Sequence, residues 1–537
     1  MKRFASLLAA SAIAFATPLD AAAPEAVPSG SDRSNLHWIG QEIEIASALE
    51  TLNRRAHVGL TVFRDVSVVD VVNTHALPHQ SVITRDGRIV WVGDATNAPD
   101  TTGAFVIDGS GLYLSPGLTD MHVHTVSLAE QLLRLATGET AVRDMDGFPW
   151  MLETRRAIES GRLLAPTEYI AGTIITSYPL DGYSVVVKTE AEARDTVRKE
   201  AACGYDFIKV HNVLKLPLFD AVADEARRAG MDLVGHIPHD ITIDHAVHSG
   251  GLRTLEHLKG FINDRNLIVS NEDYAKGIAG ADVWLTPTFY TLNGYTRQAN
   301  AAALLQQPQM QYVSLRARTE WKAVGMSDND RQLKALFDVA VPAAMQRLLP
   351  LHPRWLAGTD AANYPLQVAG FALLDELTMM EAAGIPRAEV LRAATSEPAA
   401  AMRQSSVFGQ VKRGMRADLV LLASDPTQNL NAYRDNRGVM VRGRWLDRTT
   451  LDASLAQLAA VEAEPDDQFP VTNGRVRALL RDASLLSADH IALDTMNLAD
   501  ASTSLRKLGY SAAAAELDSL TAATGPCVEI TPHGGDD

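Results

Sequence analysis

The sequence predicts an α/β protein: a (β/α)8 TIM barrel with a small β-sandwich formed from segments before and after the barrel, and helical extensions at both ends. Short apolar strands alternate with helical stretches over residues 116–404. The eight candidate strands are Leu118–His122, Ala141–Asp144, Glu168–Ile174, Phe207–Val210, Leu233–His236, Thr254–His257, Val283–Thr288 and Trp355–Gly358. The length of 537 residues leaves room for a barrel and smaller units.

Strand-like segments also lie on both sides of the barrel, in residues 58–115 and 405–450. The expected strands are Leu60–Val72, Gln80–Thr84, Ile89–Val92 and Phe105–Ile107 before the barrel, and Phe408–Leu422 and Gly438–Leu446 after it. Asp86-Gly87 is a hairpin turn signal, and Arg442-Gly443 marks a second turn. We expect the strands of these two segments to form the β-sandwich.

Three further segments have a helical pattern. Residues 24–57 form an N-terminal extension with a helix near Trp38–Arg55, and residues 451–537 form a helical C-terminal extension. The segment Tyr290–Pro353 between the last two barrel strands exceeds an ordinary connection. We expect it to be a helical insertion that covers the mouth of the barrel.

The N-terminus has the layout of a secretory signal. Lys2 and Arg3 precede the apolar run Phe4–Ala16, and A-x-A sites follow at residues 14–16 and 21–23. The run is too short to span a bilayer, and no later stretch is long and apolar enough to do so. We therefore expect residues 1–23 to be a signal peptide of a periplasmic or secreted protein.

Composition limits the partners. The 49 basic and 65 acidic residues give a net charge of −16, which argues against a nucleic-acid groove. The only cysteines are Cys203 and Cys527, which we expect to be unpaired thiols, although one bridge stays open. The expected partner is a small-molecule substrate. The sequence does not fix the oligomeric state, and a homo-oligomer stays open.

Potential metal ligands fall where the predicted barrel strands end. His122 and His124 share one face of an extended chain because they are two residues apart. The other candidates, each at or directly after the end of a different strand, are Lys209, His236, His257 and Asp360. Barrel enzymes build their sites at this rim, and imidazole and carboxylate groups are good ligands for first-row metals. Alternation along the strand points Glu256 away from the site, so we do not include it.

Around these residues the chain resembles the amidohydrolase superfamily, and within it the imidazolonepropionase-related hydrolases that include Xaa-Pro dipeptidases. The resemblance spans roughly Leu60–Leu446. It rests on these motifs: Leu114-Ser115-Pro116-Gly117-Leu118-Thr119-Asp120-Met121-His122-Val123-His124, Thr140-Ala141-Val142-Arg143-Asp144, Phe207-Ile208-Lys209-Val210, Gly235-His236, Leu255-Glu256-His257, Ala357-Gly358-Thr359-Asp360 and Gly414-Met415-Arg416-Ala417-Asp418-Leu419-Val420. It also supports joining the flanking strands into one β-sandwich.

The resemblance implies a site for two divalent metals, with zinc as the first choice. His122, His124 and Asp360 would hold the more buried ion. His236 and His257 would hold the more exposed one. Lys209, converted by CO₂ to N6-carboxylysine, would bridge the two, because a carbamate is anionic and offers two oxygens.

The same assignment implies cleavage of the C–N bond of an amide or peptide, such as a dipeptide or an N-acyl amino acid. Such metals lower the pKa of a bridging water from about 15.7 to about 7, so that hydroxide is available at neutral pH. Asp360 and His257 are the expected catalytic residues, with Asp360 passing the water proton to the leaving nitrogen.

Substrate selection is expected in the loops. Tyr178 and Tyr183 follow the third strand and Tyr290 follows the seventh, and these three are the candidate substrate-binding residues. Aromatic packing beneath a loop is an equal alternative for them. Tyr178-Pro179 also departs from the glycines that relatives often carry there.

Three other functions stay open. A lactonase or phosphoester hydrolase would use the same metals. A deaminase is less favoured, because such relatives often carry H-x-x-E after strand five, where this chain has His236-Ile237-Pro238-His239. A non-catalytic metal-binding barrel would have lost a ligand, and none of the six is lost.

Overall fold

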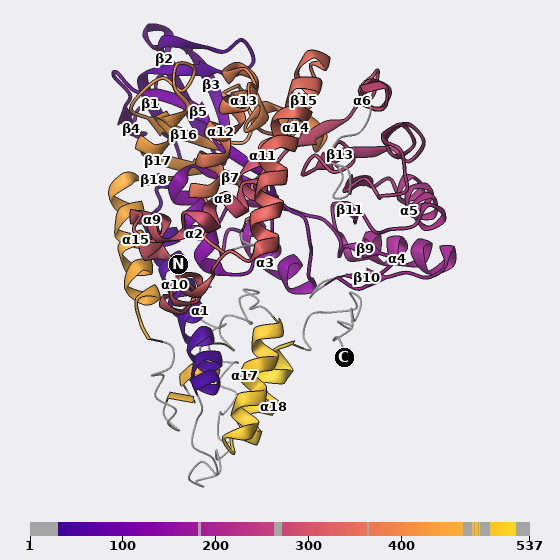
Figure 1. Ribbon diagram of the computed structural model, residues 1–537. Helices are drawn as coiled ribbons and strands as arrows, with labels where there is room; N and C mark the ends of the chain where they lie inside the picture. Colours follow the sequence, from indigo (N-terminus) through magenta and orange to yellow (C-terminus); the bar gives the residue numbers. More distant parts are fainter. Residues whose placement is uncertain are drawn as a thin grey trace.

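The computed structural model describes residues 30–180, 184–262, 271–361, 365–465, 475–476, 478–481, 483 and 495–521 (Figure 1). The expected signal peptide (1–23), Tyr183 and Cys527 lie outside these ranges. Cys203 lies within them and is half-buried.

Two parallel sheets position the predicted site. One has the order β10-β9-β11-β12-β13-β14-β15, and the other has the order β6-β7-β8. Their strands are β6 Leu118–Val123, β7 Glu139–Asp144, β8 Thr167–Ile170, β9 Ile175–Thr176, β10 Val185–Val186, β11 Phe207–Val210, β12 Asp232–Gly235, β13 Leu252–Glu256, β14 Trp284–Thr286 and β15 Arg354–Trp355. Each of the eight predicted strand segments contains or overlaps one of these, while β9 and β10 are two short additions in the loop after β8.

Backbone hydrogen bonds join the two sheets in two places. The amide of Met121 in β6 donates to Ala357 just beyond β15 (2.9 Å), and His124 donates to Ala361 (2.7 Å). Gly172, after β8, donates to Phe207 of β11, the third strand of the larger sheet (2.8 Å). The chain is therefore an α/β fold whose two parallel sheets are linked by backbone hydrogen bonds on both sides of the smaller sheet.

Helices alternate with these strands. They are α2 Leu128–Thr137, α3 Pro149–Glu159, α4 Glu190–Cys203, α5 Leu216–Ala229, α6 Asn271–Ile278, α12 Phe371–Ala382, α13 Arg387–Ala393 and α14 Ser396–Ala401, with a π-helical turn at His245–Ser249. Helix α4 has clear sequence boundaries. The Thr189 hydroxyl caps its first turn by accepting from the amide of Glu192, and Gly204 ends it with φ of 88°.

The long segment between β14 and β15 is helical, as predicted. It contains α7 Phe289–Leu292, α8 Gly294–Ala299, α9 Ala301–Leu304, the 3-10 turn η3 Pro308–Tyr312, α10 Leu315–Ala323 and α11 Asp328–Leu348. The last helix begins with a capping box, in which Ser327 and Asp330 accept each other's backbone amides. We call residues 289–351 the helical insertion.

Strands from both sides of the barrel segment form one eight-stranded sheet. Its order is β18-β17-β16-β5-β1-β2-β3, with β4 paired to β1. The strands are β1 Thr61–Asp70, β2 His75–Arg85, β3 Arg88–Asp94, β4 Phe105–Asp108, β5 Tyr113–Pro116, β16 Leu419–Leu422, β17 Asn436–Val441 and β18 Arg444–Asp447. The segment before the barrel and the segment after it meet where β5 pairs antiparallel with β16.

The prediction of one strand over Phe408–Leu422 is wrong in its first part. Only Leu419–Leu422 is a strand. The preceding residues turn instead, and Gly409 and Gly414 adopt φ of 94° and 93°, a left-handed conformation that extended strands do not have.

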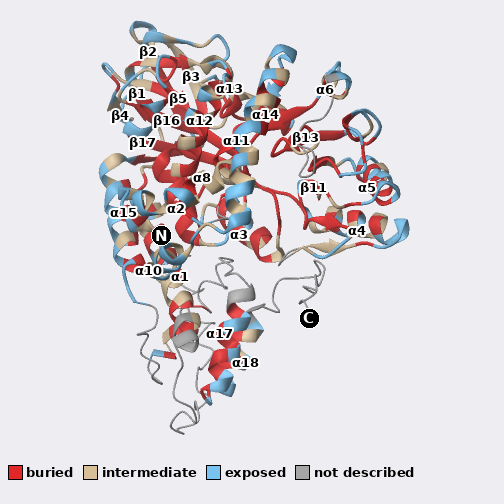
Figure 2. Cartoon of the chain, in the orientation of Figure 1, coloured by how far each residue is buried: buried red, intermediate tan, exposed pale blue. Residues whose placement is uncertain are grey.

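The helical extensions lie against each other below the barrel segment (Figures 1 and 2). Helix α1 (Gly30–Arg55) contacts α15 (Arg448–Glu462), α17 (Thr495–Lys507) and α2, and α17 contacts α18 (Ser511–Thr521). Leu36, Ile39 and Leu49 on α1 are fully buried, so apolar packing holds the two chain ends together. Among the described helices none combines the length and apolarity that crossing a membrane requires.

Candidate metal centre

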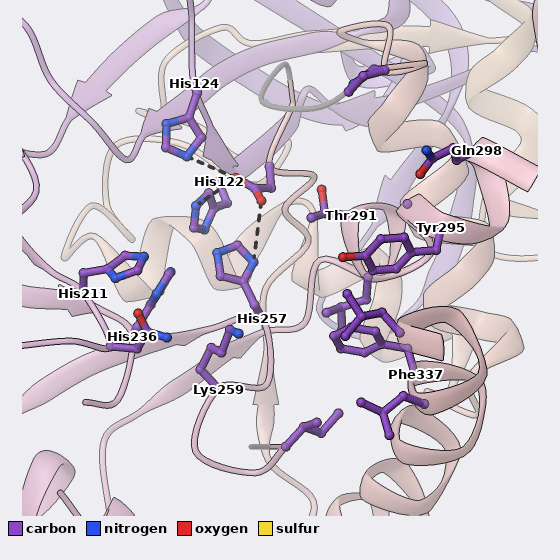
Figure 3. A pocket seen from close by; sticks show the side chains of 18 of the residues that line it. His122, His124, His211, His236, His257, Lys259, Thr291, Tyr295, Gln298 and Phe337 are labelled. Atoms are coloured by element: carbon purple, nitrogen blue, oxygen red, sulfur yellow. Dashed lines mark ion pairs between the residues drawn. The ribbon is translucent and has the colours of Figure 1, made fainter. Parts of the chain in front are cut away.

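The six predicted metal ligands gather around one cavity. His122 lies in β6 and His124 directly after it; Lys209 lies in β11; and the remaining three follow the ends of β12, β13 and β15. All six line a cavity of about 650 Å³. Figure 3 shows the four imidazoles on one side of this cavity. The structure thus brings the six side chains together from five separate strands.

Asp360 lies at the centre of the group. Its Oδ1 lies 3.1 Å from Nε2 of His124 and 3.5 Å from Nε2 of His122, and its Oδ2 lies 3.9 Å from Nδ1 of His257. His122, His257 and Asp360 each present a ligand atom within 4.8 Å of the other two. This spacing is short enough for these three side chains to share one ion.

The remaining two candidates, His236 and Lys209, line the same cavity as these four residues. The His236 ring centre lies 4.8 Å from that of His257, and on its other side 4.3 Å from that of His211. Lys209 is buried, and burial lowers the pKa of its amine to about 8. A substantial fraction of the Lys209 amine is therefore neutral near pH 7 to 8.

Local backbone geometry turns these side chains inward. Gly235, just before His236, has φ of 129°, and a Cβ there would lie 2.2 Å from the carbonyl oxygen of Val210. His257 and Asp360 have φ of 58° and 60°, left-handed values that few residues other than glycine adopt. Such strained backbone at two neighbouring rim positions is a common property of functional sites.

The expectation that Glu256 points away from the site is wrong. Its carboxylate accepts hydrogen bonds from Nδ1 of His122 (2.9 Å), from Nη2 of Arg143 (2.8 Å) and from the hydroxyl of Thr254 (2.5 Å). Glu256 is the last residue of the strand. The left-handed backbone of His257 turns its imidazole to the same face as the Glu256 carboxylate, so these two neighbouring side chains do not alternate. Arg143, on β7, was missed with it.

The charges around this carboxylate set the protonation of the site. Burial raises the pKa of Glu256, but Arg143 and His122 outweigh it and hold the pKa well below its usual range. Burial and the nearby Lys209 lower the pKa of His122 to about 4. At neutral pH His122 is thus a neutral imidazole, which is the form that binds metals.

Asp360 and His124 stabilise each other's charged forms. Burial raises the pKa of Asp360, yet His257, His124 and His122 together hold it well below the usual range. Burial lowers the pKa of His124, but the carboxylate of Asp360 outweighs burial and raises it. The contact of 3.1 Å between these two groups thus favours the protonated form of His124.

Asp120 fixes the loop that carries Asp360. Its carboxylate accepts from the hydroxyl of Thr359 (2.7 Å), from the amide of Thr359 (3.1 Å) and from the amide of His122 (3.1 Å). One buried carboxylate thus ties the end of β6 to the loop after β15. Asp120 stands in the H-x-H motif segment, but its role depends on a contact 239 positions along the chain, which the sequence does not reveal.

The donors fit a metal. Buried Nε2 of His122 and Nδ1 of His236 have no hydrogen-bond partner among the described residues. The opposite nitrogen of His122 is held by Glu256, and Nδ1 of His257 is held by the hydroxyl of Thr288 (2.7 Å). Metal-binding histidines are typically oriented in this way through their second nitrogen.

Neither of the two tyrosines that the structure describes is among the residues that line the cavity. Tyr178 is 53% exposed and lies beside Lys215. Tyr290 is buried in α7, at the start of the helical insertion, where its hydroxyl donates to the carbonyl of Leu366 (3.3 Å) and its ring stacks on Arg297. The alternative of aromatic packing therefore describes Tyr290, while Tyr178 is a surface side chain. Tyr183 lies outside the described residues.

Other residues complete the cavity wall. His211, Asn212 and Lys259 lie beside the imidazoles. The helical insertion supplies Thr291, Leu292, Tyr295, Gln298, Val324, Leu333, Leu336 and Phe337. The predicted covering of the mouth is confirmed to this extent. His211 was passed over because a lone histidine carries no signal. Burial, with the nearby Lys209, lowers its pKa to about 3.

Comparison with known sequences gives one family. The model of the Amidohydrolase family matches residues 135–446. An imidazolonepropionase of Acidiphilium cryptum is 31% identical over 121 residues, 20% of this chain and 30% of that protein. An adenine deaminase of Rubrobacter xylanophilus is 25% identical over 382 residues, 68% of this chain and 54% of that protein. The matched segments thus cover between 30% and 54% of these curated relatives.

Comparison with solved structures gives the same fold. A bottromycin amidohydrolase superposes with a TM-score of 0.64 at 24% identity, covering 80% of this chain and 97% of that one. A Xaa-Pro dipeptidase crystallised with methionine in its active site superposes with a TM-score of 0.57 at 19% identity, covering 72% of this chain and 100% of that one. At these identities the similarity concerns the fold.

Proposed function

Because this chain belongs to the amidohydrolase family, we propose that it is a metal-dependent hydrolase that cleaves the C–N bond of a small amide or peptide, such as a dipeptide or an N-acyl amino acid. The observation that carries the proposal is the convergence of four imidazoles, Lys209 and Asp360 on one cavity. The similarity in fold to an amidohydrolase and a dipeptidase supports it.

We propose that these side chains hold two divalent cations. His122, His124 and Asp360 would hold one, His236 and His257 would hold the other, and Lys209 as N6-carboxylysine would bridge them. Imidazole and carboxylate donors suit Zn²⁺ first, and also Mn²⁺, Co²⁺ or Fe²⁺. Bound cations of this kind lower the pKa of water to about 7 and polarise a carbonyl oxygen.

The chain's own residues would transfer the proton and orient the reacting groups. Asp360 is ionised at neutral pH, so it can accept the proton of the attacking water and return it to the leaving nitrogen. Hydrolysis then yields a carboxylic acid and an amine. Asp120 and Thr359 keep the carboxylate in place, and Glu256 holds the His122 ring, so both groups are oriented before substrate binds.

The Lys209 amine is suited to react with CO₂. A neutral amine is needed for this reaction, and burial lowers the pKa of Lys209 to about 8. The product carbamate would replace a buried cation with an anion beside the metals. We expect Lys209→Ala to lose metal and activity, and short carboxylates added to the buffer to restore part of both.

Elemental analysis of the purified full chain tests the proposal. We expect about two metals per chain, as in other binuclear hydrolases, and a loss of occupancy in His236→Asn. The matched control is His79→Gln, a histidine with a side chain that is 80% exposed on β2. Retention of both metals in His236→Asn, or no metal in the wild type, would contradict the assignment.

A substrate panel tests the reaction. It contains dipeptides, N-acyl amino acids, lactones, phosphotriesters and adenine. Adenine is included because one relative of this chain is an adenine deaminase. Turnover of the amides supports the proposal. Exclusive turnover of lactones, phosphotriesters or adenine would replace it by the corresponding activity, and no turnover at all by the metal-loaded protein would favour a binding role.

We propose that the two parallel sheets close into one barrel over residues 116–404. The backbone hydrogen bonds that link β6 to the residues after β15, and the residues after β8 to β11, support closure. We also propose that the eight-stranded sheet, from residues 58–115 and 405–450, folds over as a small sandwich. Phe63 and Trp445 from opposite chain ends pack edge to face across its apolar core, with ring centres 5.3 Å apart.

We propose that the mature protein is periplasmic or secreted. The basic residues, apolar run and A-x-A sites of residues 1–23 support export with cleavage of this segment. N-terminal sequencing of the protein from fractionated cells tests this. A mature protein that begins at Met1 in the cytoplasm would contradict it.

A further inference from the structure

The cavity has two chemically different walls. Figure 3 shows the imidazoles of His122, His124, His211, His236 and His257 on one side and Tyr295 and Phe337 of the helical insertion on the other. Leu333, Leu336 and Phe337 lie on α11 at the i, i+3 and i+4 spacing that places them on one helix face, and that face lines the cavity. The Tyr295 and Phe337 rings stack with their centres 6.1 Å apart. This wall can bury a large apolar group.

The apolar wall is fixed relative to the reacting centre. The Thr291 hydroxyl, on α7 of the helical insertion, donates to the carbonyl of Thr359, the residue before Asp360 (2.8 Å). Gln298 on α8 donates to the carbonyl of Gly325 (2.8 Å) and so links the early and late parts of the insertion. A group bound on this wall would lie at a set distance from the scissile bond.

A positively charged side chain, that of Lys259, lies on the histidine side of the cavity. Lys259 lies in the loop after β13, and apart from Lys209 it is the only lysine or arginine among the described residues that line the cavity. Its nitrogen end points toward His236 and His257 in Figure 3. Lys259 also lines the smaller adjoining cavity with Asn212 and Ile262. A substrate anion near the histidines would meet this ammonium group.

We propose that the site selects N-acyl amino acids, or dipeptides, with a large apolar acyl side and a free carboxylate on the leaving amine: the helical insertion binds the apolar group through Tyr295 and Phe337, and Lys259 binds the carboxylate. The scissile amide then lies between the two walls, beside Asp360. A cavity of about 650 Å³ is large enough for a molecule of this size. The inference rests on the proposed amide hydrolysis, but its two binding contacts can be tested separately from turnover.

The first experiment tests the carboxylate contact. The metal-loaded enzyme is assayed with N-phenylacetylglycine and with N-propyl phenylacetamide, in which an ethyl group replaces the carboxylate. Lys259→Met should raise KM for the first compound by about tenfold to a hundredfold, the value of a hydrogen bond to a charged group, and leave the second unchanged. Lys259→Arg should retain most of the affinity. The control is Lys412→Met, an exposed lysine in the segment before β16.

The second experiment tests the apolar contact. Phe337→Ala is compared with Val339→Ala, a side chain on the same helix that is 67% exposed. We expect Phe337→Ala to raise KM for N-phenylacetylglycine by roughly tenfold, because it removes buried apolar contact, and to leave N-acetylglycine unchanged. Val339→Ala should change neither.

Binding of 5-phenylpentanoate by calorimetry separates this inference from the reaction. This compound is N-phenylacetylglycine with –CH₂–CH₂– in place of the amide. Binding to wild type that Lys259→Met and Phe337→Ala each weaken supports the two contacts even if no amide is hydrolysed, in which case only the proposed reaction fails. If amides are hydrolysed but each variant affects both members of its substrate pair equally, the inference is overturned.

Discussion

Replacing Glu256 by glutamine tests how the site is held. The change removes one negative charge and keeps the shape, so Arg143 loses its buried counter-ion. Their atoms lie 2.8 Å apart and both side chains are at most 1% exposed. Breaking such a buried pair from one side typically costs about 3–5 kcal/mol, and the amide's remaining hydrogen bonds place our expectation at the lower end, about 3 kcal/mol of unfolding free energy.

The same substitution should weaken metal binding. Glu256 orients the His122 ring, and the loss of such a partner lowers metal affinity by about tenfold to a hundredfold, or about 1.4–2.7 kcal/mol. Affinity is measured by competition with a chromophoric chelator, and stability by urea unfolding with and without chelator.

The pH dependence of this effect has a definite sign. The pKa of Glu256 is depressed below its ordinary value of 4.5, so its stabilisation is fully present above that value and is lost as the pH falls through the folded pKa. The difference between wild type and variant should thus persist from pH 8 to pH 5. The control is Glu272→Gln, which breaks an exposed ion pair with Lys276 and should cost at most about 0.5 kcal/mol. A Glu256→Gln protein with wild-type metal affinity and a loss below about 1 kcal/mol would refute the reasoning.

Three other predictions concern the surroundings of the site. In metal-free protein His211, whose pKa burial lowers to about 3, should cost stability as the pH falls from about 6.5 toward 4, because the unfolded chain takes up a proton that the folded histidine does not. Urea midpoints against pH for wild type and His211→Gln isolate this contribution, and parallel profiles contradict it. Glu376→Ala should destabilise the helical insertion by about 1–3 kcal/mol for each unpaired amide, because this buried carboxyl group accepts the backbone N–H groups of Phe289 and Tyr290 at the start of α7. Limited proteolysis within residues 289–351 should accelerate, and unchanged cleavage would be evidence against this. Tyr290→Phe should leave KM and kcat within about twofold and cost about 1 kcal/mol of stability, since its hydroxyl donates to the backbone carbonyl of Leu366 and its side chain is not among the described residues that line the cavity; a large change in KM would restore it as a substrate contact.

Much of the site was predictable because strand ends and ligand chemistry are local properties. The H-x-H spacing at His122 and the residues at the ends of later strands could be read from short segments, since side chains at parallel strand ends meet at one rim. The lengths of the strands were predicted less well. The eighth is only Arg354–Trp355, because the chain beyond it continues to pair through single backbone hydrogen bonds.

What escaped prediction depends on backbone exceptions and distant contacts. Glu256 was misplaced because strand alternation holds only while φ is extended, and His257 departs from it. Tyr290 follows a predicted barrel strand near the site, yet its side chain packs against Arg297 of the following helix, α8, and not into the cavity. No pattern of residue types within one segment carries either fact.

The eight-stranded sheet has a consequence for folding during translation and for truncation of the chain. Strand β5 receives its partner β16 only after about three hundred further residues have been synthesised, so during translation its edge stays uncovered. Folding is therefore expected to finish late, once both termini are present. A fragment of residues 116–404 would lack α1, α15 and β17, and the buried helix α2 would lose its contacts with all three. Shortening this protein to that segment should therefore give an insoluble product rather than a smaller enzyme.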